Sequence, residues 1–232
     1  MAVSLLAWSN QIRDPTATLP PLTSSYDSEA NLLADIRTAI SAALPHTSGN
    51  YPRVLIIGAL GRSGSGAVNA CLAAGLPYSH ISKWDMAETE GGGPFAEVLE
   101  ADIFVNCIYL TSKIPPFVTL ESLSTPGRKL RVICDVSCDP TNPNNPVPVY
   151  TECTTFQRPA LPIKGVRGDG PLVTQISIDH LPSLLPREAS ESFANGLLPS
   201  LLTLRNRHSE GVWVRAEQLF NEKAAELPVG ES

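Results

Sequence analysis

Three glycines at a regular spacing are the residues of this chain with the clearest chemical meaning. Gly58, Gly61 and Gly64 follow one another at intervals of three, directly after the apolar run 54–57. That run is β-branched at three of its four positions, which is typical of a strand buried on both faces of a parallel sheet. A helical pattern starts directly after the glycines. A strand, a glycine turn and a helix start together can bind a phosphate through the N–H groups at the helix start. Glycine is needed in the turn because a side chain would hold the anion away from these N–H groups.

Asp85 strengthens the phosphate interpretation. The spacing G-x-x-G-x-x-G is less specific than the commoner G-x-G-x-x-G, so a tight turn without a ligand stays open. Asp85 ends the predicted strand 81–85 and lies 21 residues beyond Gly64, near the roughly 20 residues expected for the acid that binds the adenosine ribose. A carboxylate there accepts hydrogen bonds from both ribose hydroxyls and repels a 2′-phosphate, which predicts NAD rather than NADP. The alternative is that Asp85 only caps the following helix.

The composition is that of a globular protein with few classes of partner. The 232 residues are 43% hydrophobic and 17% charged, enough for a real core, and the net charge is −6 without a basic cluster. We therefore expect no nucleic-acid partner and no membrane partner. Five scattered cysteines lack the spacing of a zinc site and indicate a reduced intracellular location, the cytoplasm, with the peroxisome left open. Residues 1–8 are apolar but lack the features of a signal peptide.

Strand-like and helical patterns alternate along most of the chain. After the glycine turn, strands are expected at 81–85, 102–108, 130–136 and 173–178. This alternation predicts an α/β fold, a Rossmann-like parallel sheet with helices on both faces. Ligands of such sheets bind at the carboxyl ends of the strands. The residues expected to converge there are Arg62, Asp85, Tyr109, Ser137 to Asp139, Asp179 and His180.

The two ends of the chain differ from this middle part. We expect residues 1–26 to be a segment that enters from an upstream domain absent from this chain, and residues 27–183 to be the NAD-binding domain. Residues 184–232 are expected to form a helical return segment. Its two amphipathic helices follow a finished sheet and therefore need a partner to cover their apolar faces.

Five segments of the chain together identify a family. They are GALGRSG at 58–64, KWD at 83–85, GGPF at 92–95, DIFVNCIY at 102–109 and SIDHLPSLLPREAS at 177–190. Through these segments the sequence resembles fungal saccharopine dehydrogenase, the NAD-dependent, L-lysine-forming enzyme. The resemblance runs from about residue 7 to about residue 227, and the block 177–190 is its most specific part.

The resemblance implies two Rossmann-like domains with the active site in the cleft between them, of which this chain matches the cofactor domain and the return segment. The family oxidises saccharopine with NAD to L-lysine and 2-oxoglutarate, and its other domain supplies the acid–base pair. The implied partners are thus a small-molecule substrate and the upstream domain. An orphan NAD-binding module without activity is the alternative.

Residue roles follow from the resemblance position by position. Gly61 and Arg62 would contact the pyrophosphate of NAD, and Asp85 and Thr89 would lie at the adenosine. The residues implied further along the cofactor are Tyr109, Val136, Ile178, Asp179, His180 and Leu181. Those implied to face the substrate are Ser137, Cys138 and Asp139, although the family usually has alanine where this chain has Cys138.

Two other catalytic arrangements are less well supported. His180 follows a predicted strand and could act as a general base. A structural ring that packs beside Leu181 and Pro182 is the favoured interpretation, because the resemblance assigns proton transfer to the other domain. Tyr109 and Lys113 match the Tyr-x-x-x-Lys pair of short-chain dehydrogenases. That pair must lie one turn apart on a helix, whereas here it follows a predicted strand and precedes two prolines.

Overall fold

A computed structural model describes residues 1–22 and 25–227. Residues 23 and 24 of the predicted entering segment, and residues 228–232 of the predicted return segment, lie outside this part. The described chain forms two compact units that divide between Leu184 and Leu185. No helix among the described residues is both long enough and apolar enough to span a bilayer.

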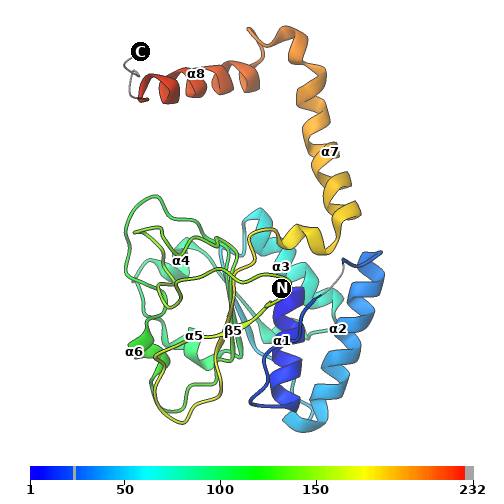
Figure 1. Cartoon of the computed structure of the whole chain (residues 1–232), viewed down its shortest axis with the longest axis vertical. Coiled ribbons are helices and arrows are strands. Elements are labelled where there is room, and N and C mark those ends of the chain that lie inside the picture. Colours follow the sequence, from blue (N-terminus) through cyan, green and yellow to red (C-terminus); the bar gives the residue numbers. More distant parts are fainter. Residues whose placement is uncertain (23–24, 228–232) are drawn as a thin grey trace. The chain divides into compact units, whose positions relative to one another are not determined.

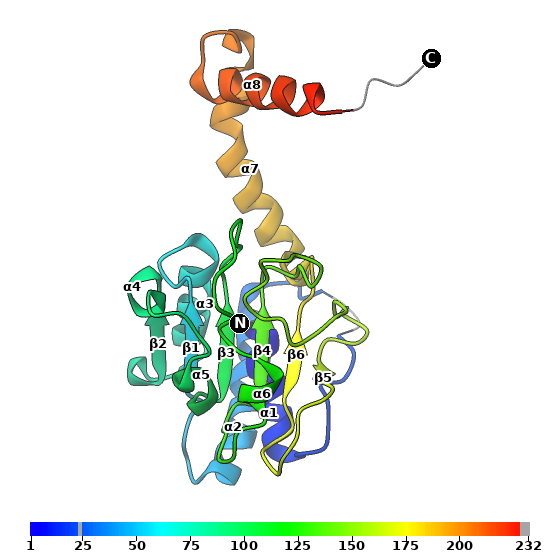
Figure 2. The same cartoon turned by 90° about the vertical axis from the view of Figure 1, so that its left-hand side faces the viewer.

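The first unit is built on a six-stranded sheet. Figure 2 shows its strands side by side in the order β2, β1, β3, β4, β6, β5. Neighbouring strands are parallel except β5, which runs antiparallel to β6 at the edge. The strands are β1 (Val54–Ile57), β2 (Ile81–Trp84), β3 (Ile103–Asn106), β4 (Val132–Asp135), β5 (Leu161–Pro162) and β6 (Thr174–Ile176). The predicted α/β class is confirmed, and β5 was not predicted because two residues carry no periodic signal.

The strand order places a topological switch point beside the glycine turn. From β1 the chain moves to β2 on one side and then crosses to β3 on the other side of β1. The connections after β1 and β3 therefore leave the sheet in opposite directions, and doubly wound sheets bind their ligands at the carboxyl ends of the strands at such a point.

Helices cover both faces of the sheet, as predicted. Figures 1 and 2 show α1, α2 and α3 on one face and α5 and α6 on the other, with α4 at the carboxyl end of β2. The helices of this unit are α1 (Ala2–Arg13), α2 (Glu29–Ala43), α3 (Arg62–Ala73), α4 (Met86–Thr89), α5 (Ala96–Glu100) and α6 (Leu120–Leu123), with short 3₁₀ turns at Leu44–Thr47, Tyr78–His80 and Leu181–Leu184.

Helix α1 was not predicted from the sequence, and it belongs to the same compact unit as the sheet. Its side chains Leu5 and Trp8 are buried, and the helix packs on α2, β3 and β4. The Gln11 Nε2 donates a hydrogen bond of 2.9 Å to Thr174 Oγ1 in β6. The first 13 residues thus form a layer of the sheet domain. The division at residue 26 remains a prediction.

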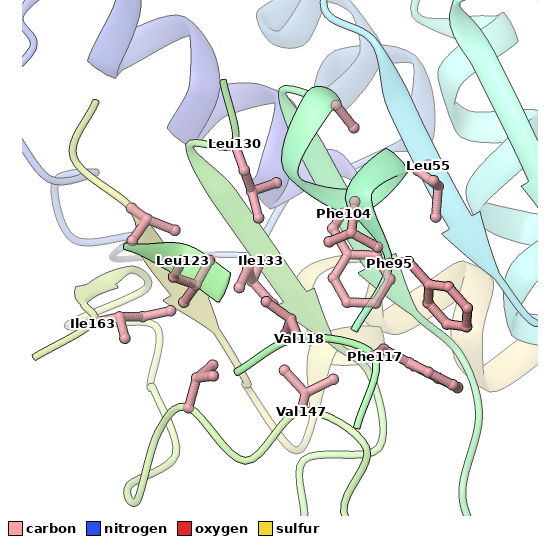
Figure 3. Close-up of a cluster of buried hydrophobic side chains, with 14 of the residues drawn as sticks. Leu55, Phe95, Phe104, Phe117, Val118, Leu123, Leu130, Ile133, Val147 and Ile163 are labelled. Atoms are coloured by element: carbon pink, nitrogen blue, oxygen red, sulfur yellow. The ribbon is translucent and has the colours of Figure 1, made fainter. Parts of the chain in front are cut away.

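One hydrophobic cluster fills the space between the sheet and α5 and α6 (Figure 3). Phe104 and Ile133 project from the central strands, and both are fully buried. Connections between the elements supply the opposite wall, including Phe95, Phe117 and Val147. Phe117 and Val147 belong to the connections that leave the carboxyl ends of β3 and β4. Because these side chains pack into the core, they hold both connections in place.

The second unit consists of α7 (Pro186–Leu202), a 3₁₀ turn (Leu204–Asn206) and α8 (Gly211–Ala225). The indole N–H of Trp213 donates to Ser200 O and Thr203 Oγ1, both at 3.1 Å, and so joins the two helices. No residue in the described part of α7 or α8 is buried. The two helices predicted from the sequence are therefore present, and most of their large apolar side chains are exposed.

Candidate functional site

The glycine turn brings the end of β1 close to the chain that leaves β3. Gly58 has φ +83°, in the left-handed region that favours glycine. A Cβ at Gly58 would lie 2.9 Å from Ile108 Cγ1 and 3.2 Å from the Cys107 carbonyl. A side chain at this position would push the two connections apart. Gly58 is therefore required by the fold of the turn.

The start of α3 presents free backbone donors. Gly61 is its N-cap and offers no side-chain oxygen to the first turn. Within the described part of the chain, no hydrogen bond uses the N–H of Arg62, Ser63 or Gly64. A Cβ at Gly64 would collide with Gly58 O and lie 2.7 Å from Ala59 Cα, so glycine lets α3 start against the turn. These donors and the helix dipole suit an anion such as a pyrophosphate.

Asp85 lies directly beside the glycine turn. Its Oδ2 accepts a hydrogen bond of 3.1 Å from Leu60 N, and its Oδ1 accepts one of 3.0 Å from Met86 N. The second bond caps α4, with Glu88 Oε2 accepting from Asp85 N at 2.8 Å. Asp85 is thus a helix cap and also links β2 to the turn. Each carboxylate oxygen has a further lone pair, so capping leaves acceptors for ribose hydroxyls.

An apolar cavity of about 640 Å³ opens next to Asp85. One wall comes from α4 through Met86 and Thr89, and the other comes from the connection after β3 through Ile108 and Ile114. The Thr89 hydroxyl donates to Asp85 O at 2.9 Å, which fixes that wall to the end of β2. Tyr109 lies between cavity-lining neighbours, and 63% of it is exposed. The size and apolar lining suit a flat aromatic group such as adenine.

The connection after β4 is organised by a buried carboxylate that the sequence analysis missed. Asp135 is fully buried, and its Oδ1 accepts from Asn106 Nδ2 at 2.9 Å and Ser137 Oγ at 2.6 Å. Its Oδ2 accepts from the Tyr150 hydroxyl at 2.6 Å. Asn106 and Asp135 are register partners at the ends of β3 and β4. The sequence did contain one signal for this network: each of the two apolar strands ends in a polar residue, Asn106 or Asp135.

Ser137, Cys138 and Asp139 follow this network and are half-buried. Cys138 has φ +51°, uncommon for a residue with a side chain, and its thiol donates to Asp135 O at 3.1 Å. Burial, followed by the nearby Asp135 charge, raises the pKa of Cys138, so this thiol stays protonated near neutral pH. A protonated thiol is a poor nucleophile, so this environment does not favour Cys138 as a nucleophile.

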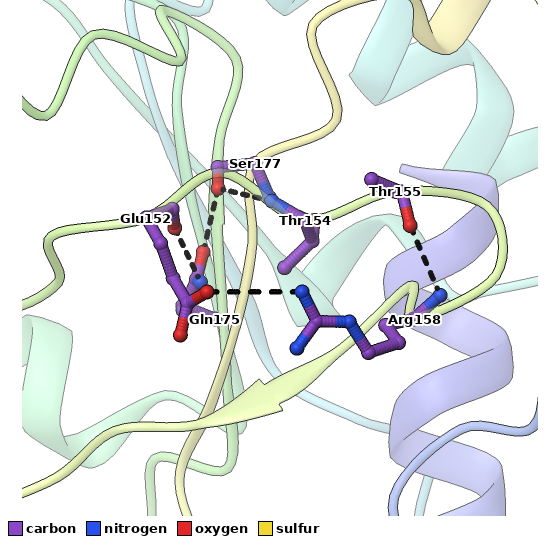
Figure 4. A network of polar contacts seen from close by, with 6 residues as sticks. All are labelled: Glu152, Thr154, Thr155, Arg158, Gln175 and Ser177. Atoms are coloured by element: carbon purple, nitrogen blue, oxygen red, sulfur yellow. Dashed lines mark hydrogen bonds and ion pairs between the residues drawn. The ribbon is translucent and has the colours of Figure 1, made fainter.

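The connection after β6 is positioned by the loop 152–158 (Figure 4). The Ser177 hydroxyl donates to Gln175 Oε1 at 2.7 Å, and Ser177 N donates to Thr154 Oγ1 at 2.8 Å. Gln175 Nε2 donates to Glu152 O at 3.0 Å. Gln175 and Ser177 are buried, so this loop fixes the course of the chain into residue 178.

The remaining predicted residues lie at the same edge of the sheet. Val136 is half-buried after β4, Ile178 is buried after β6, and Leu181 begins the 3₁₀ turn that follows. Asp179 and His180 are exposed. The His180 ring meets Phe156 edge-to-face at 5.2 Å and lines a second cavity of about 290 Å³. A packing role accounts for this geometry.

Tyr109 and Lys113 do not form a helical pair. The structure assigns no helix between β3 and α6, so the two side chains do not share a helix face. The short-chain dehydrogenase alternative lacks the geometry that its catalytic pair requires.

Comparison with known proteins supports the resemblance. No family model matches the chain. It is 54% identical over 228 residues to a protein of Neurospora crassa named saccharopine dehydrogenase [NAD(+), L-lysine-forming], a match that covers 98% of this chain and 60% of the relative. A protein of the same name from Schizosaccharomyces pombe is 49% identical over 226 residues, 97% of this chain and 61% of that protein. The chain thus spans about six-tenths of the length of these curated relatives.

Proposed function

We propose that this chain, which matches about six-tenths of fungal L-lysine-forming saccharopine dehydrogenases at about 50% identity, is the NAD-binding portion of such an enzyme. The enzyme would oxidise saccharopine to L-lysine and 2-oxoglutarate in lysine biosynthesis by the α-aminoadipate pathway. Bound NAD would accept a hydride from the secondary-amine carbon of saccharopine, and water would hydrolyse the resulting imine. Groups outside this chain would carry the proton transfer.

The observation that carries the proposal is the contact between Asp85 and the glycine turn. The distance of 3.1 Å from Asp85 Oδ2 to Leu60 N puts a carboxylate next to the free N–H groups that start α3. An adenosine diphosphate needs this combination, because its phosphates seek N–H donors while its ribose seeks an acceptor of two hydroxyl hydrogens. The adjacent apolar cavity supplies a place for the base.

The roles of the residues follow the order of the strands. Gly61 and Arg62 would hold the pyrophosphate, and Asp85 and Thr89 would hold the adenosine. Tyr109, Val136 and residues 178–181 would border the rest of the cofactor up to the nicotinamide. Residues 137–139, held by Asp135, would face the substrate.

Calorimetric titration of the chain with NAD tests the proposal. We expect binding, and we expect Asp85→Ala to weaken it by about 1–3 kcal/mol through lost ribose hydrogen bonds. Asp85→Ser is the matched variant, since serine also caps a helix but carries no charge. Asp169→Ala, an exposed aspartate far along the chain, is the control.

An assay of saccharopine-dependent NADH formation then tests whether the groups that transfer the proton lie outside this chain. NAD binding without turnover by the isolated chain agrees with proton transfer by groups outside it. Turnover by the isolated chain would show that these groups lie within the 232 residues. Unchanged NAD affinity in both Asp85 variants would place the adenosine elsewhere.

A further inference from the structure

A second carboxylate lies beside Asp85 at the proposed ribose site. Glu88 is the third residue of α4, and its Oε2 accepts a hydrogen bond of 2.8 Å from Asp85 N. The Asp85 side chain caps the same helix from the other direction. This reciprocal arrangement is a capping box, which holds both carboxylates at one helix end. Glu88 is therefore fixed in place by the backbone of Asp85.

The charge of this pair is not neutralised by a neighbouring cation. Among the ion pairs of residues 1–22 and 25–227, none involves Asp85, Glu88 or Glu90, and Glu90 lines the adjacent cavity. Lys83 Nζ lies over the ring of Tyr78, 5.0 Å from its centre. The wall at the end of β2 is thus negative and open to solvent.

We propose that Glu88 is a second specificity-determining residue, which acts with Asp85 to reject a dinucleotide phosphorylated at the ribose 2′-hydroxyl. This inference rests on the proposed function. A 2′-phosphate brings close to two negative charges to the place where Asp85 meets the ribose, and Glu88 adds a repelling charge there, with its Oε2 held 2.8 Å from the backbone nitrogen of Asp85. The unphosphorylated ribose carries no charge and is unaffected by this repulsion.

The test compares the affinities for NADH and NADPH of the wild-type chain and of Glu88→Gln. Glutamine can still accept the hydrogen bond from Asp85 N, so the variant removes the charge and keeps the capping box. Fluorescence titration gives the NADH affinity, and competition against NADH gives that of NADPH. Glu97→Gln is the matched control, because Glu97 is exposed in the first turn of α5 and lines a different cavity, with Arg53.

We expect Glu88→Gln to bind NADPH about three- to tenfold more tightly at low salt, with the NADH affinity nearly unchanged and the gain shrinking as salt rises. The inference is overturned if the ratio of the NADH affinity to the NADPH affinity is the same in Glu88→Gln as in wild type and in Glu97→Gln. That result would leave the proposed function intact. A wild-type chain that binds neither dinucleotide would overturn both.

Discussion

Removal of one hydroxyl group tests whether the buried network around Asp135 holds the carboxyl end of β4. Tyr150→Phe keeps the ring and deletes the 2.6 Å hydrogen bond from the phenol to Asp135 Oδ2. Tyr150 is 8% exposed and Asp135 is fully buried. Water therefore has little access to replace the lost donor.

The expected loss follows from the charge on the acceptor. A hydrogen bond to an ionised group contributes about 1.5–3 kcal/mol, and a carboxylate oxygen left buried without a donor pays a desolvation cost of the same order. We expect Tyr150→Phe to lower the free energy of unfolding by about 1.5–3 kcal/mol. For a domain of this size that corresponds to a fall in Tm of about 3–12 °C.

Urea unfolding followed by far-ultraviolet circular dichroism measures this loss. Tyr109→Phe is the matched control, because Tyr109 is 63% exposed, and its change is expected to stay within about 0.5 kcal/mol. In an Asp135→Asn background the effect of Tyr150→Phe is expected to fall below about 1 kcal/mol, since the acceptor is then neutral. A Tyr150→Phe protein as stable as Tyr109→Phe would refute the reasoning.

Three further predictions concern the glycine turn, the thiols and alkaline pH. Gly64→Ala is expected to cost about 1–3 kcal/mol of stability and to weaken NAD binding, because its Cβ would collide with Gly58 O. A Cβ at Gly66 on the same helix would have no atom within 4 Å, so Gly66→Ala is expected to stabilise the protein slightly. Equal unfolding curves for Gly64→Ala and Gly66→Ala would contradict the packing argument. Burial raises the pKa of Cys71 and of Cys107 to about 12, so both thiols are expected to resist alkylation at pH 8 until urea unfolds the chain, as mass spectrometry of labelled peptides would show. Burial, reinforced by the Asp135 charge, raises the pKa of Tyr150. The free energy of unfolding is therefore expected to fall as pH rises above about 10, where the tyrosine of the unfolded chain ionises. This fall is expected to be smaller in Tyr150→Phe, and the same dependence of stability on pH in both proteins would contradict the prediction.

The glycine turn and Asp85, which the sequence singled out, lie side by side in the structure, whereas the carboxylate that organises the connection after β4 was not predicted. The glycine turn and Asp85 are local signals, since a strand, a turn and a helix start lie within a few residues of one another. The structure adds that β1 and β2 pair in parallel and that Leu60 N donates to Asp85. Asp135 was missed because nothing near it in the chain shows that Tyr150, 15 residues later, turns back to donate to it.

The sequence by itself determined the α/β class, the order of its main elements and the place of the glycine turn between β1 and α3, because apolar periodicity and glycine spacing act over short distances. Only the tertiary structure decided that α1 is a layer of the sheet domain, that β5 closes the sheet edge, and that Asp135 and loop 152–158 fix the connections after β4 and β6. These features depend on contacts between residues far apart in the chain. The burial of a polar side chain and the identity of its partner are set when the sheet brings strand ends together, which no local pattern records.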